Sequence, residues 1–285
     1  MTLPQGLDPD KGWAWIRKEV EERKLVEPMM AGFFDSMILS HQSFTDSLAW
    51  ILASRLGSND EKMRDELNLV FKKCLAADSE IEDAVKADLL AVVDRDPAVE
   101  GSPRIPFLYF KGFHALEIYR ISHSLYKAGQ TDMALRLQSL CSEKLQVDIH
   151  PAARIGKGVL IDHGTGVVIG ATAVVENEVS ILHEVTLGGT GKEGEDRHPK
   201  IRRGVMIGAG AKILGNIEIG PYTLVAAGSV VMIDMPSHAT VAGVPAKVVR
   251  QRHDHTSPAS TMNQLVPEDR ETLTGTTSKL LELAR

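Results

Sequence analysis

The chain lacks the long apolar segments and paired cysteines that mark membrane and secreted proteins. No apolar run approaches the roughly 18 residues needed to cross a bilayer, and the N-terminus has no basic segment followed by an apolar core. Only two cysteines occur, Cys74 and Cys141, which are too few for a disulfide framework and are expected to be buried apolar groups in helices. These absences predict a cytoplasmic protein that does not enter a membrane.

An excess of basic residues is also missing. The formal net charge is −6, so the overall charge would not attract nucleic acid or an acidic membrane surface. Apolar residues make up 43% of the chain and charged residues 25%, which is typical of a globular protein. A chain of 285 residues can form one large domain or two ordinary ones, with a sizeable buried core.

One aliphatic position recurs every six residues in the second half of the chain. The positions are Ile149, Ile155, Ile161, Val167, Ala173, Val179, Val185, Ile201, Ile207, Ile213, Ile219, Val225 and Val231. The longer interval from Val185 to Ile201 is interpreted as one repeat plus ten inserted residues, with the spacing otherwise unbroken. A period of six fits neither a helix nor an alternating strand.

This spacing predicts a left-handed parallel β-helix, in which three hexapeptides form one triangular coil. A single coil cannot bury its own aliphatic positions, so neighbouring coils must stack roughly 4.8 Å apart and form one continuous core. The alternative, ordinary strands of a β-sandwich, would show turn signals every eight to twelve residues and an alternating pattern. The sequence favours the β-helix.

The first half of the chain shows helical spacing instead. Asp60 and Asp78 are predicted N-caps, and Pro97 is expected to end the helix that Asp78 begins. The predicted fold class is therefore α+β, an all-α domain followed by the β-helix. The predicted parts are an α-helical oligomerisation domain over 1–145, a β-helix domain over 146–250 with an inserted loop at 190–199, and a C-terminal tail over 251–285.

The tail loses the repeat and is rich in polar residues, Thr and Ser. This composition predicts a mobile segment, in which residues 278–284 could form a short helix on a partner.

Chemistry is expected at the polar residues that depart from the repeat, since the aliphatic positions offer none. Histidine exchanges a proton most readily near neutral pH, so His150, His163, His183 and His198 are candidates. A metal site is not predicted: the intervals between these histidines are thirteen, twenty and fifteen residues, unlike the zinc-binding members of β-helix proteins. The GxGxxG pattern at Gly189–Gly194 is rejected as a dinucleotide site because no helix follows it.

Several segments together carry a resemblance to a known family. They are Asp96-Pro-Ala-Val, Lys111-Gly-Phe-His-Ala-Leu, Gln146-Val-Asp-Ile-His-Pro-Ala-Ala, Asp162-His-Gly-Thr-Gly, Val185-Thr-Leu-Gly-Gly-Thr-Gly-Lys, Asp196-Arg-His-Pro-Lys, Ile207-Gly-Ala-Gly-Ala-Lys-Ile-Leu-Gly-Asn and Ala242-Gly-Val-Pro-Ala. On these segments the chain closely resembles bacterial serine O-acetyltransferases of the hexapeptide-repeat acyltransferase group, from the N-terminal helices to about Arg250.

The resemblance implies acetyl transfer from acetyl-coenzyme A to the hydroxyl of L-serine. The products would be O-acetyl-L-serine and coenzyme A, in the first step of cysteine biosynthesis. His163 is implied as the general base that takes the hydroxyl proton, and Asp148 as the acid that orients its ring. No metal is implied.

The resemblance also implies how both substrates are held. Arg197 and His198 would bind the serine carboxylate, and Asp96 and Asp162 would face its ammonium group. From spacing alone, Asp96 is better explained as a helix cap before Pro97; the resemblance reverses that preference. Coenzyme A is expected in a groove between coils of adjacent subunits, along a set of backbone and basic positions: Gly189, Ala209, Ala227 and Lys247, with Lys212 and Arg250 as further candidates for its phosphates.

Family members form trimers through the β-helix and pair as hexamers through the helices, and cysteine commonly inhibits them. Many insert a C-terminal isoleucine into cysteine synthase. This sequence ends Leu283-Ala-Arg285, which argues against that partnership. Two rival functions are an acyltransferase for another small hydroxyl or amine acceptor, and an inactive scaffold or regulatory partner.

Overall fold

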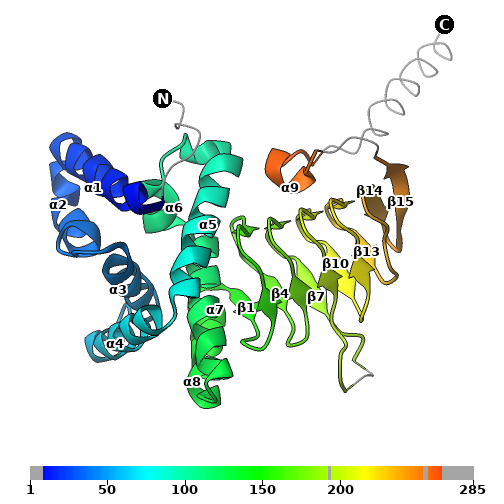
Figure 1. Cartoon of the computed structure of the whole chain (residues 1–285), viewed down its shortest axis with the longest axis horizontal. Coiled ribbons are helices and arrows are strands. Elements are labelled where there is room, and N and C mark those ends of the chain that lie inside the picture. The colour runs from blue at the N-terminus through cyan, green and yellow to red at the C-terminus, as the bar shows by residue number, and fades with distance from the viewer. Residues whose placement is uncertain (1–8, 192–193, 253–255, 265–285) are drawn as a thin grey trace, which may run out of the picture.

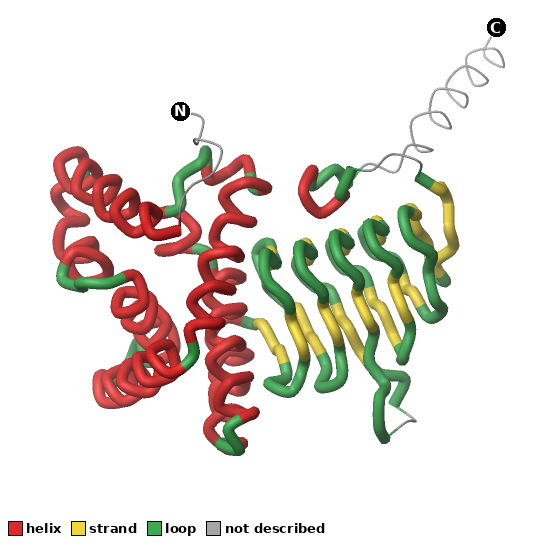
Figure 2. Tube along the Cα trace, in the orientation of Figure 1, coloured by secondary structure: helices red, strands yellow, loops and turns green. Residues whose placement is uncertain are grey.

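The computed structural model describes residues 9–191, 194–252 and 256–264, and shows a helical part followed by a stack of short strands (Figures 1 and 2). The helical part comprises α1 (Pro9–Val26), η1 (Pro28–Met30), α2 (Ala31–Phe34), η2 (Asp35–Leu39), α3 (Phe44–Leu56), α4 (Glu61–Ala77), α5 (Ser79–Arg95), η3 (Pro97–Val99), α6 (Arg104–Tyr109), α7 (Lys111–Lys127) and α8 (Thr131–Leu145). None of the helices in these residues is both long and apolar enough to cross a membrane.

The predicted caps set where the helices begin. The Asp60 carboxylate accepts a hydrogen bond from the Met63 backbone N–H at 3.0 Å, and Asp78 accepts one from Glu80 at 3.1 Å. Both bonds satisfy donors that a first helical turn leaves unpaired. Cys74 and Cys141 are free cysteines on α4 and α8. Cys141 is buried, as predicted, whereas Cys74 is only partly buried.

The strands form the three faces of a prism. Face A is the sheet β1–β4–β7–β10–β13, face B is β2–β5–β8–β11, and face C is β3–β6–β9–β12–β14–β15. All pairings are parallel except that between β14 and β15. The strand bounds are β1 (Val147–Ile149), β2 (Arg154–Ile155), β3 (Leu160–Ile161), β4 (Val167–Ile169), β5 (Val174–Val175), β6 (Ser180–Ile181), β7 (Thr186–Gly188), β8 (Lys200–Ile201), β9 (Met206–Ile207), β10 (Lys212–Leu214), β11 (Glu218–Ile219), β12 (Leu224–Val225), β13 (Val230–Val231), β14 (Ala239–Gly243) and β15 (Ala246–Gln251). The prediction of a parallel β-helix after an all-α part is confirmed.

The expectation of an unbroken spacing from Ile149 to Val185 is wrong. Ile161 pairs with Ile181, so the first coil has 20 residues, whereas Ile169 pairs with Leu187 and closes an ordinary coil of 18. Two extra residues therefore lie between Ile161 and Ile169. The sequence hid them because each repeat buries two aliphatic positions two residues apart: Val167 and Ile169 are 0% and 1% exposed.

The ten inserted residues that were expected at one place are instead divided between two places. Leu187 pairs with Ile213, 26 residues later, so eight extra residues lie between β7 and β8. The other two form the turn that carries His163. Both insertions leave the stacking of the three faces intact, because each is confined to a corner of the prism.

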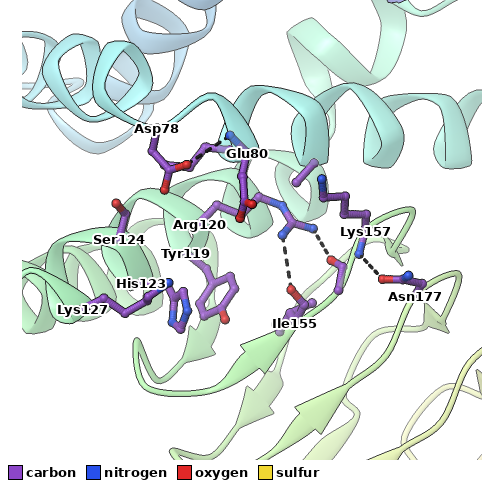
Figure 3. Close-up of a pocket in the computed structure, with 13 residues that line it drawn as sticks. Asp78, Glu80, Tyr119, Arg120, His123, Ser124, Lys127, Ile155, Lys157 and Asn177 are labelled. Carbon is purple, nitrogen blue, oxygen red and sulfur yellow. Dashed lines mark hydrogen bonds between the residues drawn. The ribbon is translucent and has the colours of Figure 1, made fainter.

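The helical part packs directly on the first coil. The Asp88 carboxylate accepts a hydrogen bond from the Val159 backbone N–H at 2.7 Å, and the Arg120 guanidinium donates to the Gly156 carbonyl at 2.7 Å. Figure 3 shows Arg120 reaching from α7 to the backbone of the coil. Since α8 ends at Leu145 and β1 begins at Val147, a single residue separates the last helix from the first strand.

The prediction of a mobile tail after residue 250 is wrong for the part that the structure describes. The strand β15 extends to Gln251, and Pro258–Thr261 forms the short helix α9, which packs on face C. Ala259 is fully buried, and its carbonyl accepts a hydrogen bond from the Ser180 hydroxyl at 3.0 Å. The expected helix over 278–284 lies outside the described residues, as does the C-terminus considered for cysteine synthase.

Candidate active site

Asp162, His163 and His183 meet at one edge of the prism, the C–A corner, where the chain passes from face C to face A. The His163 side chain is 73% exposed, and its Nε2 lies 3.7 Å from an Asp162 carboxylate oxygen. The His183 ring stands nearly perpendicular to it, with 5.8 Å between the ring centroids. His183 therefore lines the same site as the predicted base.

Asp96 lies next to this edge. Its carboxylate caps the turn η3 through the Ala98 backbone N–H at 2.8 Å, so the cap interpretation is correct. It also lines, with Asp162, a pocket of about 550 Å³ between the end of α5 and the first coil. The structure thus brings the two carboxylates of the predicted ammonium site together.

The environment of Asp162 favours its neutral form. Burial raises the pKa of this carboxyl, the neighbouring histidine His163 opposes that rise, and the negative charge of Asp96 adds to it. A cation placed between the two carboxylates would relieve both the burial and the repulsion. The pocket is therefore suited to a small ammonium group.

Arg197 and His198 lie at a different edge, the A–B corner, and are fixed by Thr172. The Thr172 hydroxyl accepts hydrogen bonds from the backbone N–H groups of Arg197 at 3.1 Å and His198 at 3.2 Å. The Arg197 guanidinium also donates to the Gly194 carbonyl at 3.3 Å. A residue of an ordinary coil thus holds the end of the inserted loop.

His198 is buried against the backbone of the neighbouring coil. Its Nδ1 accepts the Thr172 backbone N–H at 3.2 Å, so Nδ1 carries no proton and Nε2 is the donor of the neutral ring. A side chain at Gly170 would overlap His198, because an added Cβ would lie 2.0 Å from Nε2. Burial and the adjacent Arg197 lower the pKa of His198, which keeps the ring neutral.

Asp148 points outward from β1 on face A, between the two edges. Its carboxylate accepts a hydrogen bond from the Gln138 side chain of α8 at 2.7 Å. Among the described contacts, none joins Asp148 to His163 of the same chain. The predicted pair of base and orienting acid is therefore not formed within one chain.

The predicted coenzyme A positions divide between the same two edges. Ala209 and Ala227 continue the C–A corner beyond His183: the Gly210 N–H donates to the His183 carbonyl at 2.9 Å, and the Gly228 N–H to the Ala209 carbonyl at 2.8 Å. Lys247 is exposed on β15, in the last coil. Gly189 lies at the A–B corner instead, where an added Cβ would be 3.1 Å from the Arg197 side chain.

No group of three or more metal-ligating side chains occurs in the described ranges. His150 uses its Nδ1 to accept the Ala152 backbone N–H at 3.0 Å, which gives this histidine a structural role. A separate pocket of about 310 Å³, lined by Tyr119, Arg120 and His123 among others, contains none of the predicted site residues (Figure 3).

Comparisons with known proteins identify the family of the chain. The family model "Serine acetyltransferase, N-terminal" matches residues 13–118, and "Bacterial transferase hexapeptide (six repeats)" matches residues 198–232. The serine acetyltransferase of Haemophilus influenzae is 50% identical over 252 residues, which cover 88% of this chain and 93% of that protein. The chain belongs to the serine acetyltransferase family.

Solved structures of serine acetyltransferases share the whole architecture. One in complex with cysteine superposes with a TM-score of 0.87 at 49% identity, covering 91% of this chain and 100% of the other. The enzyme from Brucella abortus in complex with coenzyme A gives 0.82 at 49% identity, covering 86% and 97%. The chain is therefore an acyltransferase of this family, as its sequence predicts.

The sequence analysis missed three residues that contact the candidate site residues or their turns. Thr172 fixes Arg197 and His198, Gln138 holds Asp148, and Lys111 contacts the turn of His163. Thr172 and Gln138 carry no signal in the sequence, because a threonine in a coil turn and a glutamine in a helix are ordinary. Lys111 lies in one of the segments that carry the family resemblance, which was the available signal.

Proposed function

We propose that this chain transfers the acetyl group of acetyl-coenzyme A directly to the hydroxyl of L-serine, in the first step of cysteine biosynthesis. The proposal rests on the arrangement at the C–A corner, where the exposed His163 lies beside a pocket that Asp96 and Asp162 help to line. That arrangement offers a base for a hydroxyl and a cationic subsite for an α-ammonium group on the same small molecule.

His163 acts as the general base. Its ring takes the serine hydroxyl proton as the oxygen attacks the thioester carbonyl, and the resulting imidazolium returns that proton to the departing coenzyme A sulfur. No acyl-enzyme forms, because serine itself is the nucleophile. The gain in rate also comes from holding the two substrates together.

The carboxylate of serine binds at Arg197 and His198. The guanidinium provides a planar pair of donors, and the neutral His198 ring adds the Nε2 proton. These residues lie at the A–B corner, however, whereas the carboxylate pair and His163 lie at the C–A corner. A three-residue strand of face A separates the corners by roughly 10 Å, which is longer than a serine molecule.

A second copy of the chain therefore completes the site. The C–A corner of one subunit meets the A–B corner and face A of its neighbour, so that Asp148 of that neighbour receives a hydrogen bond from His163 Nδ1. Because the contact is heterologous, it can close into a ring, and the trimer expected of the family sets that ring at three subunits. Pairing of two trimers through the helices gives the hexamer expected of the family.

Coenzyme A lies along the C–A corner, past Ala209 and Ala227 toward Lys247. The small side chains at those positions leave the backbone of each coil open to a pantetheine arm. Cysteine, which differs from serine only in the thiol, occupies the same acceptor site and inhibits. Relatives solved in complex with coenzyme A and with cysteine support the binding of both molecules.

The acceptor assay tests the function. Thiol release from acetyl-coenzyme A is measured with L-serine, L-homoserine, L-threonine and sugars as acceptors, and serine is expected to give the highest kcat/KM. A higher value with a sugar or an amine would show that this family member has a different acceptor.

Replacing the base tests the mechanism. We expect His163→Ala to lower kcat by about 10²–10⁴-fold, the usual range for general base catalysis, with the oligomer intact by gel filtration. Asp148→Asn should lower kcat less, since the base remains. A kcat for His163→Ala near that of the unchanged enzyme would eliminate His163 as the base.

A further inference from the structure

The turn that carries His163 has an unusual backbone. Residues 162–166 include the two extra residues of the first coil, and three of them adopt positive φ: His163 at 57°, Gly164 at 78° and Gly166 at 73°. Glycine adopts this conformation freely, but for histidine it costs about 1–2 kcal/mol. The surrounding structure must therefore hold His163 in place.

The backbone of the turn is tied to both of its neighbours. The Gly166 N–H donates to the Gln146 carbonyl at 2.8 Å, and the Glu184 N–H of the next coil donates to the Thr165 carbonyl at 2.7 Å. These bonds fix the end of the turn. They do not involve the side chains.

The first turn of α7 presses on the same segment. An added Cβ at Gly112 would lie 2.1 Å from the Ile161 carbonyl oxygen, and an added Cβ at Gly164 would lie 3.1 Å from the Gly112 Cα. The helix can approach this closely only because both positions lack a side chain. The approach places the preceding residue, Lys111, over the turn.

Lys111 connects the turn to the entrance of the β-helix. Its ammonium donates to the Thr165 hydroxyl at 2.5 Å and to the Gln146 side-chain carbonyl at 3.4 Å. Thr165 lies two residues after His163, and Gln146 joins α8 to β1. One cation thus links the helical part, the first strand and the segment of the base.

We propose that Lys111 is a positioning residue for His163, acting through Thr165. The inference rests on the proposed role of His163 as the base. Lys111 contributes little to stability, because an exposed charged contact contributes between about 0 and 1 kcal/mol. Its effect is on the alignment of the imidazole with the acceptor hydroxyl, where a displacement of about 1 Å can cost 10²-fold in rate.

The test compares Lys111→Met, Thr165→Val and the double variant in steady-state kinetics. Each single variant is expected to lower kcat at least tenfold with KM for serine and acetyl-coenzyme A within twofold, and the double variant to be no worse than the poorer single one. Thr165→Ser keeps the hydroxyl and should retain most of kcat. Lys157→Met is the matched control, an exposed lysine at another corner of the same coil.

The outcomes distinguish a failure of the positioning role of Lys111 from a failure of the proposed function. A kcat for Lys111→Met within twofold of the unchanged enzyme, or multiplicative losses in the double variant, would overturn the positioning role while the serine activity stands. Absence of serine turnover in the unchanged enzyme would instead reject the proposed function. Unfolding midpoints of the variants, measured alongside, are expected to stay within 2 °C, and a larger fall would assign Lys111 a structural role.

Discussion

At the scale of single residues, the site depends on how Asp162 ionises. An ordinary aspartate is charged above about pH 4, whereas burial and the nearby Asp96 raise the pKa of Asp162. Only the charged form attracts an ammonium group. As the pH falls through the raised pKa, the carboxyl takes up a proton. We therefore expect the proposed contact with the serine ammonium group to be lost at a higher pH than an exposed aspartate would allow.

We expect Asp162→Asn to raise KM for serine about 10- to 100-fold, because a hydrogen bond to a charged group is worth about 1.5–3 kcal/mol. The KM of the variant should also lose its dependence on this carboxyl at acidic pH. Stability should not fall: a carboxyl with a raised pKa stabilises the fold only in its protonated form, and that contribution is lost as the pH rises.

The kinetic measurement is a pH series of KM for serine. Asp94→Asn is the control, since Asp94 is exposed and lines the same pocket. If Asp162→Asn and Asp94→Asn shift KM equally, the pocket does not bind the ammonium group through Asp162.

At the scale of elements, the sequence predicted the β-helix but not its register. The six-residue spacing is strong because every coil repeats the same burial, and the helical part followed from its caps and apolar spacing. The two-residue insertion could not be detected because each repeat buries two aliphatic positions that lie two residues apart, such as Val167 and Ile169. A two-residue insertion moves the six-residue spacing from one of these positions to the other, so the spacing still looks unbroken. The candidate residues of the site were recognisable as polar departures from the repeat. Their partners Thr172 and Gln138 were not, since contacts between distant segments leave no local pattern.

The interface of α5 and α7 with the first coil contains buried charged residues. Asp88 and Glu117 are fully buried, and the Arg120 guanidinium lies between them: its Nε is 2.7 Å from Asp88 and 3.4 Å from Glu117. Burial raises the pKa of Asp88 to about 6, and burial together with Asp88 raises that of Glu117. One cation thus compensates two carboxyls, and the pKa values of both remain raised.

Replacing Arg120 with Met should destabilise the protein by about 3–5 kcal/mol at pH 8, the usual cost of leaving a buried charge without its partner. Without the cation both carboxyl pKa values rise further, so at pH 5.5 they are largely neutral and the loss is smaller. The deficit should therefore grow as the pH rises. Urea unfolding at the two pH values measures it, with Arg203→Met, an exposed arginine of the β-helix, as the control. An equal loss of unfolding free energy at both pH values would contradict this account of the buried charges at the interface.

At the scale of the whole molecule, the chain forms stacked coils (Figure 2). The two groups of candidate site residues lie on separate edges of this prism. Each edge is regular, because a position on one coil is repeated on the next coil. One edge can therefore pack along its length against an edge of a neighbouring copy. The helices then serve to fix the first coil, where the inserted turn of His163 lies. On the proposed mechanism, a subunit on its own has the base His163 but not the carboxylate-binding residues Arg197 and His198 beside it.

Mixed oligomers test this arrangement. His163→Ala and Arg197→Ala chains carrying different affinity tags are expected to be nearly inactive apart at low serine. Co-expressed and purified through both tags, they should form trimers in which some interfaces pair the intact C–A corner of one chain with the intact A–B corner of the other. Purification through both tags leaves only trimers with two chains of one kind and one of the other. A heterologous ring of that composition has one such interface in three, so activity should return to about one third of that of the unchanged enzyme. If instead one chain supplies the complete site, every site in the mixture retains a defect, and activity would stay at the level of the separate variants.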